Sequence, residues 1–176
     1  MLDFTTNSDK ALAKRAFDAM MTMRKIDIAA LDAAARGVTR ITVETNVEAP
    51  VAAVWRAYLT PADIMQWNAA SDDWHTTAAT VDLRVGGAFS SRMEAKDGSF
   101  GFDFAGVYTR IVEHQRLEYD FGDRKAEVDF VPQPKGVTVR VTFDIEPTHS
   151  LDQQRDGWQA ILNRFARHVE TKTGNA

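Results

Sequence analysis

The sequence contains no cysteine, and this absence excludes several kinds of chemistry at once. A chain without thiols forms no disulfide, no thiolate nucleophile and no cysteine-based zinc or iron–sulfur site. No stretch of about 18 apolar residues is present, which excludes a membrane-spanning helix. The first residues, MLDFTTNSDKALAKR, carry acids and hydroxyls where a signal peptide has an apolar stretch. We therefore expect a cytoplasmic protein.

The chain also has no excess of positive charge. Lys and Arg number 21 against 25 Asp and Glu, which gives a net charge of −4. Non-specific binding to nucleic acid requires clustered cations that displace counterions, so we expect no nucleic-acid partner. At 176 residues the length suits one domain with an appendage, and it is sufficient to bury a full hydrophobic core.

Sequence motifs of common cofactor sites are missing. There is no nucleophile elbow, phosphate-binding loop, dinucleotide fingerprint or zinc motif. Gly86-Gly87 lies between predicted strands, a context typical of a tight turn or bulge. Asp72, Asp73 and His75 are close in sequence, but adjacent aspartates rarely converge on one ion. We therefore expect neither a metal nor a cofactor.

Residues 1–38 differ in composition from the remainder and predict a helical N-terminal extension. A helical period begins at Ser8, and Asp27 and Gly37 are typical of the start and end of a second, shorter helix. The methionines of this segment are Met20, Met21 and Met23. They suit either internal packing or a surface that docks a partner, and a homodimer through these helices is one expectation.

The hydrophobic period changes to two at Arg40, which predicts a strand over 40–48. Helical spacing returns over 51–58. A second short helix is expected from Pro61, with Thr60 as its N-cap, followed by a loop over 68–77.

Alternating apolar residues predict further strands joined by short turns. They fall at 81–85, 89–94, 100–108, 116–121, 126–130 and 137–145. Ser150 and Gln153 then form a capping-box pattern before a long amphipathic helix, and 171–176 reads as a disordered tail. The sum is an α+β domain with a curved antiparallel sheet of about seven strands.

Specific motifs add a resemblance to a known fold family. Val47-Glu48-Ala49-Pro50-Val51 followed by Val54-Trp55-Arg56-Ala57 resembles the opening of the SRPBCC, or START-like, superfamily. Over about 39–170 the chain resembles its branch named for the activator of the heat-shock-protein-90 ATPase. The motifs that carry the likeness to this branch are Pro61 through Trp67, Val85-Gly86-Gly87-Ala88-Phe89, Met93, Asp97-Gly98, Gly106-Val107-Tyr108, Leu117-Glu118-Tyr119 and Asp156-Gly157-Trp158.

The resemblance implies a helix-grip fold, in which a curved sheet wraps a long C-terminal helix and an apolar cavity lies between them. Members include lipid-transfer domains, plant allergens, polyketide cyclases and co-chaperone domains, so the likeness implies a cavity and no particular reaction. Residues 14–37 separately resemble the C-terminal tail of glyoxalase-like (vicinal oxygen chelate) proteins. That second likeness implies a glyoxalase-like partner domain.

Candidate ligand contacts come from the implied cavity and from the unusual segment 67–77, which combines indoles, carboxylates, an amide and an imidazole. Such a segment suits the polar rim of an apolar pocket, although a loop packed by its tryptophans is the alternative. The strand and helix aromatics could equally fill a solid core. The candidates are Trp67, Asn68, Trp74, His75, Met93, Phe102, Phe104, Tyr119, Trp158, Leu162 and Phe165.

Three functions remain open from the sequence. The first is binding of a small, mostly hydrophobic molecule in the cavity. The second is a cyclase-like enzyme in which His75 or Asp72 acts as base and Tyr119 donates a hydrogen bond to an enolate-like oxygen. The third is a chaperone-associated module that works through the N-terminal helices. Whether any reaction is catalysed stays undecided.

Overall fold

A seven-stranded antiparallel sheet curls around one long helix in this computed structural model, which describes residues 40–174. The expected N-terminal helices lie outside the described residues. The elements in chain order are β1 (Arg40–Val47), α3 (Val51–Leu59), α4 (Pro61–Trp67), β2 (Trp74–Val81), β3 (Ala88–Ala95), β4 (Gly101–Val112), β5 (Arg116–Phe121), β6 (Arg124–Gln133), β7 (Gly136–Asp144) and α5 (Leu151–Gly174). This α+β arrangement is the helix-grip fold that the sequence predicts.

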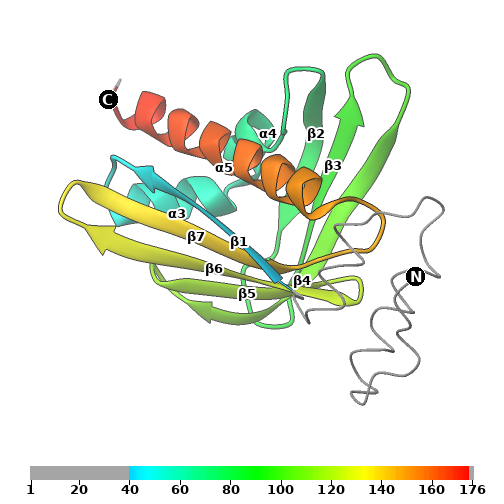
Figure 1. Cartoon of the computed structure of the whole chain (residues 1–176). Helices are drawn as coiled ribbons and strands as arrows, with labels where there is room; N and C mark the ends of the chain where they lie inside the picture. Colours follow the sequence, from blue (N-terminus) through cyan, green and yellow to red (C-terminus); the bar gives the residue numbers. More distant parts are fainter. Residues whose placement is uncertain (1–39, 175–176) are drawn as a thin grey trace, which may run out of the picture.

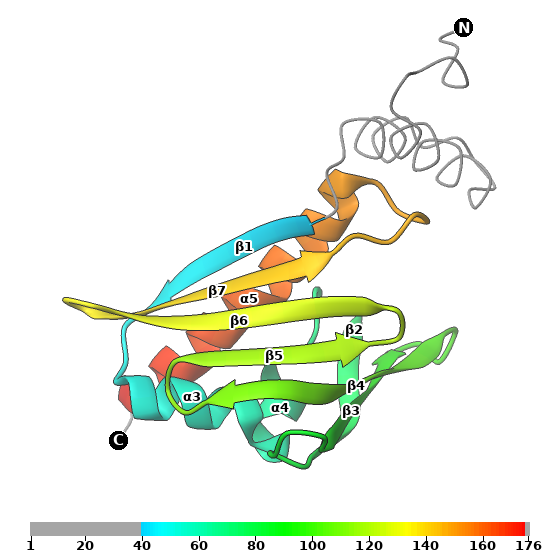
Figure 2. The same cartoon turned by 90° about the horizontal axis from the view of Figure 1, so that it is seen from below.

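The sheet is a meander with one long crossover. Its spatial order is β1-β7-β6-β5-β4-β3-β2, so the first strand pairs with the last and the two earliest strands lie at opposite edges. Helices α3 and α4 carry the chain from the β1 edge to the β2 edge. Figures 1 and 2 show α5 lying along the concave face, with α3 and α4 at one end of it.

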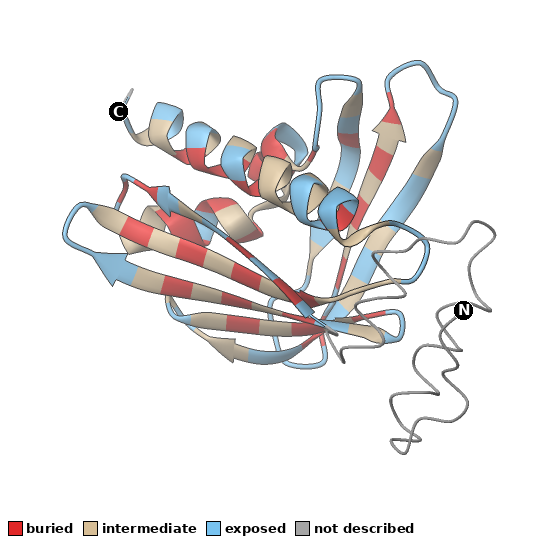
Figure 3. Ribbon diagram, in the orientation of Figure 1, coloured by how far each residue is buried: buried red, intermediate tan, exposed pale blue. Residues whose placement is uncertain are grey.

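The core follows the period-two pattern of the strands. Buried and partly exposed residues alternate along β5, β6 and β7, so each strand turns every second side chain toward α5 (Figure 3). Helix α5 faces the sheet with a buried apolar stripe formed by Leu162, Phe165, Ala166 and Val169. The sheet and the helix therefore bury their apolar faces against each other.

The start of α5 is fixed by the predicted capping box. The Gln153 N–H donates to Ser150 Oγ at 3.0 Å, and the Ser150 N–H donates to Gln153 Oε1 at 3.1 Å. Thr60 is the N-cap residue of α4 as predicted, and its carbonyl accepts the Ile64 N–H at 2.9 Å. Its hydroxyl does not cap the helix, because it donates to the Arg56 carbonyl at the end of α3 at 2.7 Å.

Three boundaries differ from the sequence-based expectation. Residues 74–77 belong to β2 and not to a loop, because they pair with the end of β3. Leu83 and Val85 lie in an exposed turn and not in a strand. Helix α5 continues to Gly174, so the expected disordered tail at 171–176 is helical for most of its length. No helix within 40–174 has both the length and the apolar character needed to cross a membrane.

Candidate ligand-binding cavity

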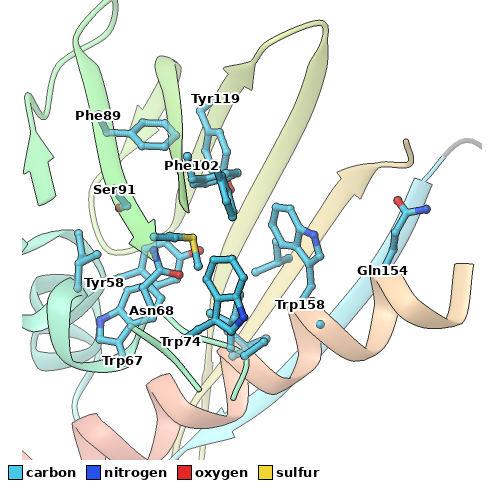
Figure 4. A pocket seen from close by; sticks show the side chains of 18 of the residues that line it. Tyr58, Trp67, Asn68, Trp74, Phe89, Ser91, Phe102, Tyr119, Gln154 and Trp158 are labelled. Atoms are coloured by element: carbon cyan, nitrogen blue, oxygen red, sulfur yellow. The ribbon is translucent and has the colours of Figure 1, made fainter. Parts of the chain in front are cut away.

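A cavity of about 550 Å³ lies between α5, α4 and the concave face of the sheet. Its walls come from segments far apart in sequence, including the end of α3, the segment 67–74, strands β3 to β5, and the first turns of α5. Figure 4 shows Phe89, Ser91 and Tyr119 extending from the sheet, with Trp158 rising from α5 on the other side. This is the size of a typical small-molecule site.

The structure brings most of the predicted ligand contacts together in this cavity. These residues belong to α4 and the turn after it, to strands β2 to β5, or to α5, and all of them face the cavity. The predicted residues that line it are Trp67, Asn68, Trp74, Met93, Phe102, Phe104, Tyr119, Trp158 and Leu162.

Two predicted contacts lie elsewhere. His75 is exposed on β2, because its neighbours Trp74 and Thr76 take the inward positions of the alternating strand. Phe165 is fully buried, but it packs behind the cavity wall, with its ring centroid 5.2 Å from that of Tyr58 and 5.0 Å from that of Trp67.

The carboxylate predicted as a base also lies outside the cavity lining. Asp72 accepts a hydrogen bond from Arg164 Nη1 at 2.8 Å on the outer side of α5, and its side chain is 90% exposed. This ion pair holds the pKa of Asp72 below its ordinary value. Asp72 therefore ties the 68–73 turn to α5 and faces solvent.

An aromatic frame gives the cavity its shape. The ring of Phe89 contacts Tyr119 edge-on, with centroids 5.0 Å apart, and Phe104 contacts Trp158 edge-on at 6.0 Å. Phe89 can lie flat on β4 only because its cross-strand partner is Gly106: a Cβ there would stand 2.7 Å from the Phe89 ring and against the Asp120 carbonyl. Glycine at position 106 therefore leaves the space that the Phe89 ring occupies in the cavity wall.

The mouth of the cavity carries a second aromatic group. Trp74 lies 6.0 Å from the rings of both Phe100 and Phe102, measured between centroids. Phe102 is 39% exposed and Phe100 is 62% exposed, yet only Trp74 and Phe102 line the cavity. An apolar ligand that enters would cover part of this exposed surface.

Charged groups lie at the end near the start of α5. Glu146 is half-buried, and burial opposes its ionisation. Its carboxylate accepts hydrogen bonds from the His149 N–H and from the Thr148 N–H, and it contacts the His149 ring. These interactions outweigh burial and lower the pKa of Glu146. Buried Gln154 donates to the carbonyls of Glu146 and His149 and accepts the Glu146 N–H. Arg124 also lines the cavity, with its guanidinium carbon 4.5 Å from the Phe121 ring centroid.

The sequence-based reading missed several polar groups of the cavity. Tyr58, Ser91, Tyr108 and Arg124 line it, although none was predicted to do so. Ser91 and Arg124 did carry a signal, since each shares the inward-facing phase of its strand with apolar residues. Burial raises the pKa of Tyr108 to about 12, and it raises those of Tyr58 and Tyr119 further above the usual range. All three phenols therefore keep their protons at neutral pH.

Comparison with known proteins agrees with this architecture. The model of the family described as Activator of Hsp90 ATPase homolog 1-like protein matches residues 48–170. The chain belongs to this family. A search of curated proteins finds no match.

Solved structures of family members and neighbours share the fold. The AHSA1-like protein from Aeromonas hydrophila is 47% identical, with a TM-score of 0.72 over 76% of this chain and 94% of that protein. Chr148 from Cytophaga hutchinsonii is 41% identical, with a TM-score of 0.66 over 78% of this chain and 96% of its own. CV1439 from Chromobacterium violaceum is 26% identical, with a TM-score of 0.66 over 74% and 97%. The segment that resembles glyoxalase-like proteins lies outside the match to the family model.

Proposed function

We propose that this AHSA1-like protein binds a small, mostly apolar molecule in the cavity beneath α5. The observation that carries the proposal is the cavity itself, which is about 550 Å³ in volume and is lined by aromatic and aliphatic side chains with few polar groups. Such a combination of apolar walls and sparse polar groups is typical of sites that enclose a small ligand and orient it. The START-like resemblance points the same way.

The position of the titratable groups favours binding over catalysis. The expected bases, His75 and Asp72, do not line the cavity. The phenols that do line it stay protonated at neutral pH and can donate hydrogen bonds, but they cannot accept a proton. A cyclase-like reaction would have to take its base from Glu146 or His149, which line the cavity near the start of α5 and contact each other at 2.9 Å.

Native mass spectrometry of the gently purified protein tests the proposal. A reproducible non-covalent adduct of a few hundred daltons, lost on denaturation, is the expected result. The same spectrum gives the number of subunits and so tests the homodimer expected from the N-terminal helices. Failure to detect an adduct, followed by failure of any apolar probe to bind the purified protein, would contradict the proposal.

A further inference from the structure

All three tyrosines of the chain line this one cavity. Tyr108 on β4 and Tyr119 on β5 are direct cross-strand partners, so their side chains leave the same face of the sheet. Both rings pack on Phe89, with centroids 5.2 Å and 5.0 Å away. Tyr58 lines the cavity from α3, and its ring contacts the rings of Trp67 and Phe130.

The three phenols belong to the lining of the same cavity. Tyr108 and Tyr119 lie side by side, because they are cross-strand partners and both rings pack on Phe89. A negative charge on Tyr58 or on Tyr108 would raise the pKa of Tyr119, which agrees with this shared position. Tyr58, Tyr108 and Tyr119 are called the tyrosine cluster below.

None of the tyrosine cluster hydroxyls bonds to another group among residues 40–174. Tyr108 and Tyr119 are only 4% and 5% exposed. Within the described part of the chain, no fully buried polar side-chain atom lacks a hydrogen-bond partner. Because all three tyrosines line the cavity, their hydroxyls can donate to a molecule inside it. A ligand that displaces water from a hydroxyl and offers no acceptor loses that hydrogen bond, so a ligand with an acceptor is favoured.

The surroundings of the tyrosine cluster argue for an uncharged acceptor. Among residues 40–174, Arg124 is the one lysine or arginine that lines the cavity, and its guanidinium lies over the Phe121 ring. The lining also contains the carboxylate of Glu146, which His149 contacts. A ligand carboxylate would therefore enter a mostly apolar cavity that already holds a carboxylate, and burying an ion without a dedicated partner is unfavourable. A carbonyl oxygen accepts from more than one donor and carries no such cost.

Resting on the proposed function, we propose that the tyrosine cluster is a recognition site for a carbonyl oxygen, so that the ligand is an apolar molecule bearing a ketone, aldehyde, ester or amide group. The apolar walls would enclose the carbon skeleton, and the phenols would fix its orientation. Specificity would then favour carbonyl compounds over hydrocarbons of the same shape.

A matched series of probes tests this inference. Binding of acetylnaphthalene, ethylnaphthalene and naphthoate is measured by calorimetry on the full chain. The same titrations are run on Tyr58→Phe, Tyr108→Phe and Tyr119→Phe, each of which removes one hydroxyl and keeps the ring. Thr42→Val is the control, because its hydroxyl bonds Thr142 at 3.0 Å on the outer face of the sheet.

We expect acetylnaphthalene to bind the native chain more tightly than ethylnaphthalene. A ketone oxygen has two lone pairs, so at least one and at most two of the Tyr→Phe changes should weaken ketone binding about two- to tenfold, which is the effect of losing one hydrogen bond. All three variants should bind ethylnaphthalene as the native chain does. Unchanged ethylnaphthalene binding also shows that the variant keeps its cavity. If acetylnaphthalene and ethylnaphthalene bind equally well, the carbonyl inference is wrong and the proposed function stands. The same holds if naphthoate binds most tightly of the three and loses this affinity in Arg124→Gln. Binding of none of the probes would overturn the proposed function as well.

Discussion

Trp158 of α5 and Phe143 of β7 stack face to face, with ring centroids 4.0 Å apart and planes 9° from parallel. This pair joins the long helix to β7, the strand next to the β1 edge of the sheet. Phe143 is fully buried, whereas Trp158 is half-buried because its other side faces the cavity. The stack therefore contributes to folding and to the cavity wall together.

Trp158→Ala should destabilise the fold by about 2–4 kcal/mol, near the lower part of the range for truncating a large core aromatic, because one side of the indole already faces open space. Urea denaturation measures the change. Asp156→Ala, an exposed change on the same turn, is the control and should leave stability nearly unaltered. Equal stability of the two variants would show that the stack does not hold α5 to the sheet.

The buried carboxylate of Asp63 links α4 to the end of α5. Its Oδ1 accepts from Lys172 Nζ at 2.7 Å and from His168 Nε2 at 2.9 Å. Burial opposes ionisation, but these two partners outweigh it and hold the pKa of Asp63 below its ordinary value. The resulting stability is complete above the ordinary pKa near 4 and is lost as the pH falls through the lower pKa of the folded state.

Asp63→Asn should therefore cost about 1.5–3 kcal/mol at pH 7, the range for hydrogen bonds to charged groups. The difference in unfolding free energy between the native chain and this variant should shrink below about pH 4. Denaturant titrations at pH 7 and pH 3 measure it. Asp72→Asn, whose ion pair is exposed, should change stability little at either pH. A difference for Asp63→Asn that does not depend on pH would contradict this account.

The capping box at the start of α5 positions the first turns that line the cavity. Ser150→Ala removes the acceptor of the Gln153 N–H and should cost about 1 kcal/mol, as measured by thermal or chemical denaturation. Ser150→Thr keeps a hydroxyl in place and should stay close to the native value. If both variants lose the same stability, the hydroxyl is not the stabilising group.

Trp74 at the cavity mouth should contribute to ligand affinity more than to folding. Trp74→Ala is expected to weaken an apolar probe about two- to tenfold, since it removes aromatic contact area that faces the cavity. Phe100→Ala is the matched control, because Phe100 contacts Trp74 but does not line the cavity. Fluorescence titration of a naphthalene probe compares them, and an equal loss in both would place the binding site outside the cavity.

The sequence predicted the fold well because its information is local and periodic. The alternation in β5 to β7 and the stripe of α5 could be read directly, and the motifs around Pro50 and Gly106 pointed to the family. The site was harder to predict. Tyr58 and Tyr108 have the spacing of ordinary core residues, and only the crossover of α3 and α4 from one sheet edge to the other brings them to the same cavity.

Other differences arise where two partners compete for one group. Thr60 is the N-cap residue of α4, but its hydroxyl donates to the Arg56 carbonyl and accepts no N–H from the first turn of the helix. His75 stands beside cavity residues in sequence, but strand alternation turns it outward. Spacing alone does not reveal either outcome, because each depends on where a strand begins or a helix ends.

Gly157 offers the most direct test of the central claim that the cavity is the binding site. It lines the cavity from α5, and a Cβ added there meets no atom within 4 Å. Gly157→Ala should stabilise the helix by about 0.5–1 kcal/mol and keep binding, whereas Gly157→Phe should place a ring in the open space. Calorimetric titration of acetylnaphthalene into both variants should show near-native affinity for Gly157→Ala and at least a tenfold loss for a folded Gly157→Phe. Unchanged affinity in Gly157→Phe would contradict the account.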